Sequence, residues 1–181
     1  MKASRRAGSC SVATRGQIGA AIAAGQPTLA LDVDALLSGV QSAASLADWV
    51  IAQPQDSIPL IYSSADPATL QAIQARLGQH ASGALVESTL AEVAKRLRDA
   101  GFSRYLVAGG ETSGAVVAAL GVTMLEIGPE IAPGVPWTRS ICGPDLVLAL
   151  TGLEPEEVRA AGVRILSDKV DIANVRLRSE E

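Results

Sequence analysis

Hydrophobic and polar positions along the chain alternate between two periodicities. From residue 14 onward, segments with apolar residues three or four apart exchange with short apolar runs, roughly every ten to fifteen residues. The first pattern indicates helices and the second indicates buried strands. Their alternation is typical of α/β domains. We therefore predict the α/β class, with a three-layer domain in which a mostly parallel sheet is flanked by helices.

The predicted elements can be placed by these periods and by their capping residues. Helices are expected at residues 14–25, 40–52, 66–78, 85–100 and 115–120, and strands at residues 28–31, 57–62, 105–108, 122–127 and 145–150. Thr14 and Gln17 have the spacing of a capping box, and Gly25 is placed to end the first helix. These caps set the expected start and end of that helix.

Two segments do not follow the alternation. Residues 128–138 contain Pro129, Pro133 and Pro136, so we predict a loop there. After Leu150, the sequence around Glu154 has the form of a new helix start, and residues 163–166 have the form of a short strand.

Composition narrows the class of protein. The chain has 181 residues, of which 48% are hydrophobic and 3% aromatic, which fits one soluble domain. Its 15 Lys and Arg residues against 19 Asp and Glu residues argue against a protein that wraps nucleic acid through many phosphate contacts. We therefore expect no nucleic-acid partner, although this balance does not exclude one bound phosphate.

The two cysteines and the longest apolar stretch bear on three properties: metal binding, disulfide bonds and cellular location. Cys10 and Cys142 lie far apart and neither belongs to a CxxC or Cys/His cluster, so no metal site and no disulfide framework is expected. A reducing cytoplasm is the default location. The apolar stretch 115–127 is too short for a membrane span, and no signal peptide is expected at the start of the chain.

The most suggestive chemical feature is a glycine turn between a predicted strand and a predicted helix. Residues 109–114 read Gly-Gly-Glu-Thr-Ser-Gly. Glycines there would let backbone N–H groups approach an anion that the helix dipole also favours. The hydroxyls of Thr112 and Ser113 could cap the helix or contact phosphate oxygens, and Glu111 could hold Mg²⁺ or be a solvated charge. The turn matches neither GxxxxGK[ST] nor GxGxxG, and a purely structural turn explains it equally well.

Four other features of the sequence could carry chemistry. Residues 8–11, Gly-Ser-Cys-Ser, could present donors to an anion, or could be a linker into the first helix. Cys10 is disfavoured as a nucleophile because His80 has no recognisable partner motif. Trp137 could stack on a flat ring such as adenine, or could plug the proline-rich segment onto the core. Asp32 and Asp34 could share a face of a strand or mark a capped strand-to-helix corner.

Taken in order, these motifs resemble one family. Residues 8–17, 108–114, 127–131 and 133–137 are similar to the C-terminal nucleotide-binding domain of the four-carbon acid sugar kinases. The resemblance extends from about residue 8 to about residue 150. It implies a linker at 1–7, a nucleotide-binding α/β domain at 8–150 and a divergent segment at 151–181.

The resemblance also implies an activity and a site. The family's enzymes use ATP, with Mg²⁺, to phosphorylate a four-carbon sugar acid such as a threonate, erythronate or 3-oxo-tetronate. Carried over residue by residue, the nucleotide site would be lined by Ser9, Ser11, Gly109, Gly110, Glu111, Thr112 and Gly128. No catalytic residue can be assigned, and a homo-oligomer is compatible with this interpretation.

Two departures from the family pattern bear on activity. The family's N-terminal domain, which binds the sugar acid, is not expected here because Met1 almost adjoins the first motif. The family's Lys-Ser-Gly-Asn-Phe-Gly turn is replaced after Leu150 by residues 151–155, Thr-Gly-Leu-Glu-Pro. We therefore expect weakened ATP binding and no kinase activity from the chain alone. The alternative is a degenerate, non-catalytic α/β module for binding or oligomerisation.

Overall fold

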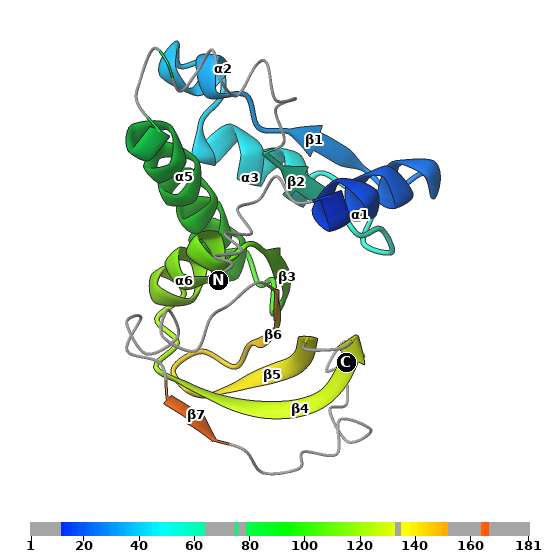
Figure 1. Cartoon of the computed structure of the whole chain (residues 1–181), viewed down its shortest axis with the longest axis vertical. Helices are drawn as coiled ribbons and strands as arrows, with labels where there is room; N and C mark the ends of the chain where they lie inside the picture. Colours follow the sequence, from blue (N-terminus) through cyan, green and yellow to red (C-terminus); the bar gives the residue numbers. More distant parts are fainter. Residues whose placement is uncertain (1–11, 64–74, 76–78, 133–134, 152–163, 167–181) are drawn as a thin grey trace, which may run out of the picture. The chain divides into compact units, whose positions relative to one another are not determined.

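A computed structural model of the chain describes residues 12–63, 75, 79–132, 135–151 and 164–166 (Figure 1). The chain forms two compact units, residues 1–102 and residues 103–181. No helix among these described residues is long and apolar enough to cross a membrane. Each unit has its own helices, strands and buried residues.

The first unit consists mainly of helices around a short parallel pair of strands. Its elements are α1 (Val12–Ala23), β1 (Thr28–Ala30), α2 (Val33–Leu37), α3 (Ala43–Ile51), β2 (Leu60–Tyr62) and α5 (Gln79–Asp99). Strands β1 and β2 pair in parallel, with Leu29 opposite Ile61. Helix α3 packs against α5. Leu46, at 1% exposure on α3, and Val93, at 4% on α5, belong to the core of this unit.

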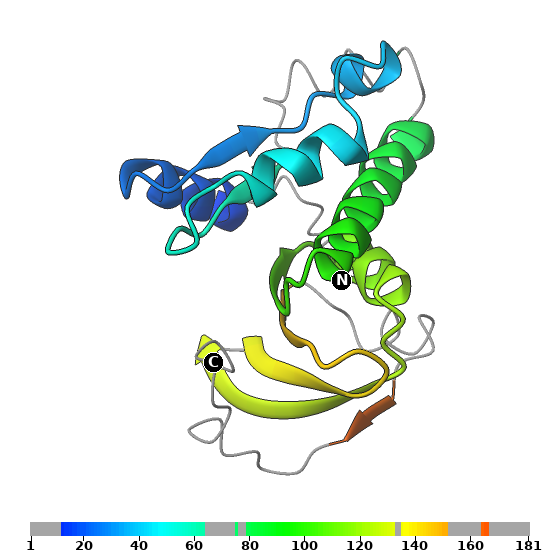
Figure 2. The ribbon, with the colours of Figure 1, turned by 180° about the vertical axis from the view of Figure 1, so that it is seen from behind.

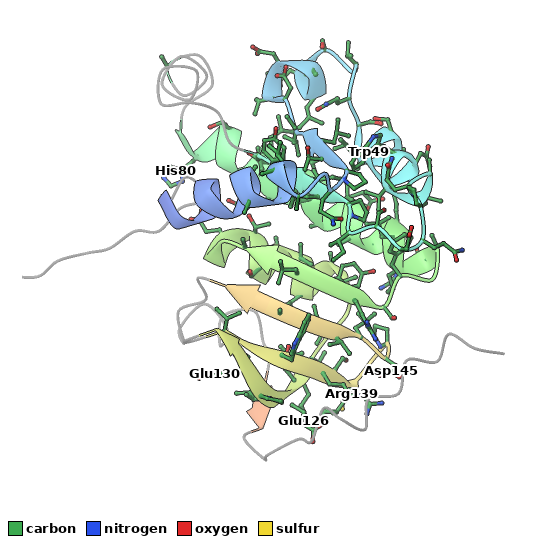
Figure 3. The ribbon with its side chains drawn as sticks, turned by 90° about the vertical axis from the view of Figure 1, so that its right-hand side faces the viewer. Trp49, His80, Glu126, Glu130, Arg139 and Asp145 are labelled. Carbon is green, nitrogen blue, oxygen red and sulfur yellow. The ribbon has the colours of Figure 1, made fainter. Side chains whose placement is uncertain are left out.

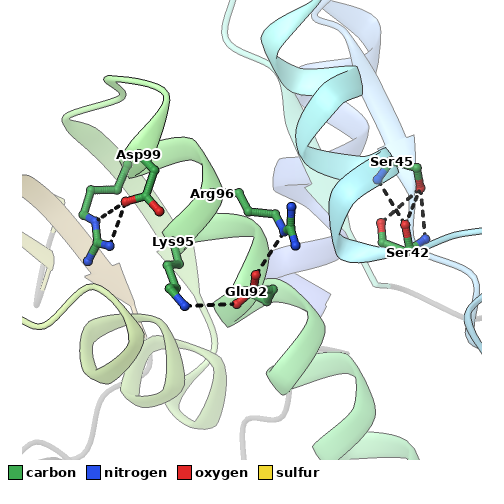
Figure 4. Close-up of polar contacts among 7 residues, drawn as sticks. Ser42, Ser45, Glu92, Lys95, Arg96 and Asp99 are labelled. Atoms are coloured by element: carbon green, nitrogen blue, oxygen red, sulfur yellow. Dashed lines mark hydrogen bonds and ion pairs between the residues drawn. The ribbon is translucent and has the colours of Figure 1, made fainter.

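Side chains cap and brace these helices. The Ser42 hydroxyl accepts a hydrogen bond from the Ser45 N–H at 3.1 Å, and the Ser42 N–H donates to the Ser45 hydroxyl at 2.9 Å (Figure 4). This reciprocal cap makes α3 begin at Ala43, three residues after the predicted start. On α5, Glu92 forms ion pairs with Lys95 and Arg96 (Figure 4).

The second unit is a mixed sheet with one helix. Its elements are β3 (Arg104–Ala108), α6 (Gly110–Ala119), β4 (Met124–Ala132), β5 (Val135–Cys142), β6 (Val147–Thr151) and β7 (Arg164–Leu166), in the sheet order β3-β6-β5-β4-β7. The pairs β3–β6 and β4–β7 are parallel, whereas β5 is antiparallel to both β6 and β4. Figure 2 shows β4 and β5 as long, curved strands.

The core of this second unit lies between α6 and the sheet. Helix α6 packs against β3 and β6. Leu148 on β6 and Leu120 at the end of α6 have no exposed surface, and Val116 and Val117 of α6 are also buried. This packing places the first turn of α6 at the end of β3.

The α/β class predicted from the periodicity is confirmed. The loop predicted at 128–138 is wrong, because β4 and β5 cover most of it and pair with each other. Pro129 is accommodated because the register shifts between Ile127 and Glu130, where the ladder is interrupted. Because proline is rare inside strands, the prolines of this segment led to the prediction of a loop instead of two paired strands.

The bounds of other helices also differ from the predicted ones. Thr14 is inside α1 rather than at its N-cap, and α5 begins at Gln79, six residues before its predicted start at Leu85. The short helix α2 was not predicted. Of the expected helix at 66–78 the structure describes only Ala75, which is helical, and the helix start expected at Glu154 lies outside the described residues.

Candidate functional site

The turn between β3 and α6 is built on one glycine. Gly109 is the N-cap of α6, with φ 107° and ψ 131°, a backbone conformation that residues with a Cβ rarely adopt. It makes no side-chain cap, and the Ser113 N–H donates to its carbonyl at 2.8 Å. The first N–H groups of a helix, here those of Gly110, Glu111 and Thr112, have no partner within the helix. The first turn of α6 therefore has N–H groups that receive no side-chain cap from Gly109, at the positive end of the helix dipole.

The side chains of this turn differ in exposure. Gly110 is buried, Thr112 is 8% exposed and Ser113 has no exposed surface. Among the described residues, nothing forms a hydrogen bond with the Ser113 hydroxyl. Glu111 is exposed. The predicted site residues 109–112 are thus contiguous, but the turn is tighter than expected because the helix begins at Gly110 instead of Ala115.

Gly128 lies on β4, on the same sheet. Ile127 pairs with Thr138 and Glu130 pairs with Pro136, so Gly128 and Pro129 together oppose the single residue Trp137. This is the arrangement of a β-bulge, a feature that often re-aims side chains next to active sites. The structure therefore places Gly128 opposite Trp137 and three strands from β3 in the sheet order.

The carboxyl ends of β3, β6 and β4 lie at one edge of the sheet, because these three strands run in the same direction. Ligands of open α/β sheets bind outside the carboxyl ends of the strands. Gly109 directly follows β3 at this edge, and Gly128 lies within β4.

Charged side chains of the same sheet are labelled in Figure 3. Arg139 and Asp145 form an ion pair at 3.1 Å near the turn between β5 and β6, and Glu126 and Glu130 belong to β4.

The remaining candidates have mixed outcomes. Ser9 and Ser11 lie outside the described residues, as does Cys10. His80 is exposed in the first turn of α5. Asp32 is the N-cap of α2 and accepts from the Asp34 N–H at 2.8 Å, so the capped corner is the correct interpretation of this pair. Within the part of the chain that the structure describes, no group of three or more His, Cys, Asp or Glu residues is placed to hold a metal.

Comparison with known proteins identifies the family. The family described as "nucleotide-binding C-terminal domain" matches residues 6–152. The chain belongs to this family. The resemblance predicted from the four motifs is therefore confirmed.

Named relatives of this nucleotide-binding C-terminal domain are kinases. The chain is 47% identical over 144 residues to a 3-oxo-tetronate kinase of Brucella melitensis, covering 79% of this chain and 33% of the relative. It is 46% identical over 144 residues to a 3-oxo-tetronate kinase of Pseudomonas fluorescens, covering 80% and 33%. The chain thus spans about one third of the length of these relatives.

A solved structure shares the fold. A Haemophilus influenzae protein of the family DUF1537 has 36% sequence identity and a TM-score of 0.72, over 86% of this chain and 39% of that protein. Fold and sequence therefore agree on the family.

One arrangement in the domain, the placement of Trp137 opposite Gly128, was not predicted from the sequence. The only signal was short, because Val135 and Trp137 occupy alternate positions but Arg139 ends the apolar alternation. The prolines in residues 128–138 favoured a loop more strongly than this alternation favoured a strand. Neither the spacing of the motifs nor their order shows that the third and fourth motifs are neighbouring strands.

Proposed function

We propose that this domain binds ATP with Mg²⁺ and is the nucleotide-binding part of a cytoplasmic, ATP-dependent kinase that phosphorylates a hydroxyl of a four-carbon sugar acid, of the tetronate or threonate type. The observation that carries the proposal is the first turn of α6. Gly109, at φ 107°, ends β3 and leaves donors of that turn without a side-chain cap, in a domain of the nucleotide-binding family. Phosphate is the ligand for which such a helix start is suited.

The residues of the turn fit the phosphates of ATP and a bound Mg²⁺. Backbone N–H groups of Gly110, Glu111 and Thr112 would bind phosphate oxygens, and the exposed carboxylate of Glu111 would hold Mg²⁺. Ser9 and Ser11 are proposed to line the same site, on the strength of the resemblance. In phosphoryl transfer the protein acts mainly by positioning and by stabilising charge, and backbone donors on a rigid helix provide both.

The nucleotide proposal is tested with two alanine substitutions at the two ends of α6. Gly109→Ala forces a side chain onto φ 107°, so the donors of the first turn must shift. We expect the affinity for Mg·ATP to fall about 10- to 100-fold, because hydrogen bonds to a charged ligand are lost. Calorimetric titration of the full chain measures this change.

Gly121→Ala is the matched control. Gly121 follows the other end of α6 at φ 73°, and an added Cβ meets nothing within 4 Å. This variant therefore carries backbone strain without disturbing the first turn, and its affinity should equal that of the unmodified chain. Equal binding by Gly109→Ala would place the nucleotide elsewhere, and absence of binding by the unmodified chain would refute the proposal.

The proposed dependence on another region has its own test. Because the chain spans 33% of its kinase relatives, the sugar acid is proposed to bind to a region outside the match. The chain alone should release no ADP from ATP, Mg²⁺ and a panel of tetronates. Adding the remaining region of the Brucella melitensis relative should restore ADP release with at least one tetronate. Turnover by the chain alone would refute the claim that it is inactive alone.

A further inference from the structure

The sheet of the second unit has two different faces. On β3, Tyr105 and Val107 are each 9% exposed, whereas Leu106 between them is 66% exposed. Tyr105 pairs with the fully buried Leu148. Because α6 packs against β3 and β6, these buried side chains belong to the face that α6 covers. Leu106 points to the opposite face, since successive residues of a strand alternate between faces.

One row of apolar side chains crosses that opposite face. Leu106 pairs with Ala149, and Ala149 pairs with Trp137, so the three side chains lie on the same face. We call Leu106, Ala149 and Trp137 the apolar row. Ala149 has no exposed surface, Trp137 is half-buried and Leu106 is exposed. The small side chain of Ala149 thus lies at a covered position between two large apolar groups.

The apolar row is close to the proposed phosphate site. Gly109 is three residues beyond Leu106, which is roughly 10 Å along a strand, and Trp137 is two strands from β3, which is roughly 10 Å across the sheet. An extended nucleoside triphosphate can bridge such a span. The bulge at Gly128 and Pro129 directly opposes Trp137, so the predicted site residue Gly128 borders the same row.

We infer that Trp137 is the base-stacking residue of the nucleotide site, with the apolar row receiving the flat face of the base while the first turn of α6 receives the phosphates. This inference rests on the proposed function. Flat aromatic bases gain affinity by stacking on tryptophan, and a half-buried indole offers such a surface. Stacking recognises the π-face that every base has, so Trp137 contributes affinity with little choice among bases.

The test separates the base from the phosphates. The full chain carries Trp49→Phe, which leaves Trp137 as the only tryptophan of the two in the sequence. Mg·ATP and Mg·tripolyphosphate are titrated separately, with binding measured by calorimetry and Trp137 emission recorded in parallel. ATP should change the Trp137 emission, whereas tripolyphosphate, which has no base, should bind without changing it.

Two substitutions then measure the contribution of the ring. In the full chain, Trp137→Leu should weaken ATP binding about 10-fold. It should leave the affinity for tripolyphosphate unchanged. Trp137→Phe keeps an aromatic ring and should recover most of the ATP affinity. Far-UV circular dichroism of each variant verifies that it is folded.

Three results would overturn the inference. The first is equal ATP affinity in Trp137→Leu and the unmodified chain, and the second is unchanged Trp137 emission while ATP binds. The third is a loss of tripolyphosphate affinity in Trp137→Leu as large as its loss of ATP affinity, which would mean that Trp137 has a purely structural role. A chain that binds neither ATP nor tripolyphosphate would refute the proposed function itself, and the inference with it.

Discussion

Leu148→Ala is expected to lower the free energy of unfolding of the second unit by about 2–5 kcal/mol. Leu148 is on β6 and has no exposed surface. It pairs with Tyr105 on one neighbouring strand and with Thr138 on the other, and the Thr138 hydroxyl donates to its carbonyl at 2.9 Å. This backbone is held from both sides and cannot easily close on a smaller side chain, so a cavity would remain.

The measurement needs a reporter for this unit, because the chain forms two compact units that need not unfold together. Urea denaturation is followed by the emission of Trp137 in a Trp49→Phe background. Ile141→Ala is the control, since Ile141 is on β5 of the same sheet but is 43% exposed. A loss for Leu148→Ala no larger than that for Ile141→Ala would contradict the assignment of Leu148 to the core.

The sequence was a good guide to elements with an unbroken period. The apolar run at 105–108 and the short run at 163–166 correspond to β3 and β7, because a buried strand leaves few polar positions. The first helix ends as predicted, with Gly25 at φ 71°. The pairing of β4 with β5 was not predictable in the same way, since a bulge absorbs Pro129 and only the partner strand shows where a bulge occurs.

In the candidate site too, features formed by neighbouring residues could be predicted from the sequence, whereas contacts between distant segments could not. A glycine turn after a strand is visible in the sequence, and the structure adds that Gly109 alone has the unusual backbone conformation while Gly110 already belongs to the helix. The apposition of Gly128 and Trp137 depends on sheet register, which is a long-range property. Glu111 could not be separated from an ordinary solvated charge by spacing, and its exposure leaves it available for Mg²⁺.

The second large effect is expected at the turn between β5 and β6. Gly143 has φ 107°, and a Cβ added there would lie 2.8 Å from the carbonyl oxygen of Gly121. Neither the backbone at Gly121 nor the turn at Gly143 can move freely. The Gly121 N–H donates to the Ala118 carbonyl at the end of α6, and on the other side the Ser140 N–H donates to the Leu146 carbonyl at 2.8 Å. The close contact therefore joins two hydrogen-bonded segments of backbone.

Gly143→Ala is expected to lower the free energy of unfolding of the second unit by about 2–4 kcal/mol, the sum of backbone strain and a steric clash with backbone. Gly121→Ala should lower it by only about 1–2 kcal/mol, because its φ is also positive but its Cβ would meet nothing within 4 Å. Both values come from urea denaturation followed by Trp137 emission in the Trp49→Phe background. The difference between the two variants measures the clash together with the greater backbone strain of φ 107° compared with φ 73°. Equal losses would mean that the turn yields without resistance, and the close approach of Gly143 to Gly121 would then not be a fixed feature of the fold.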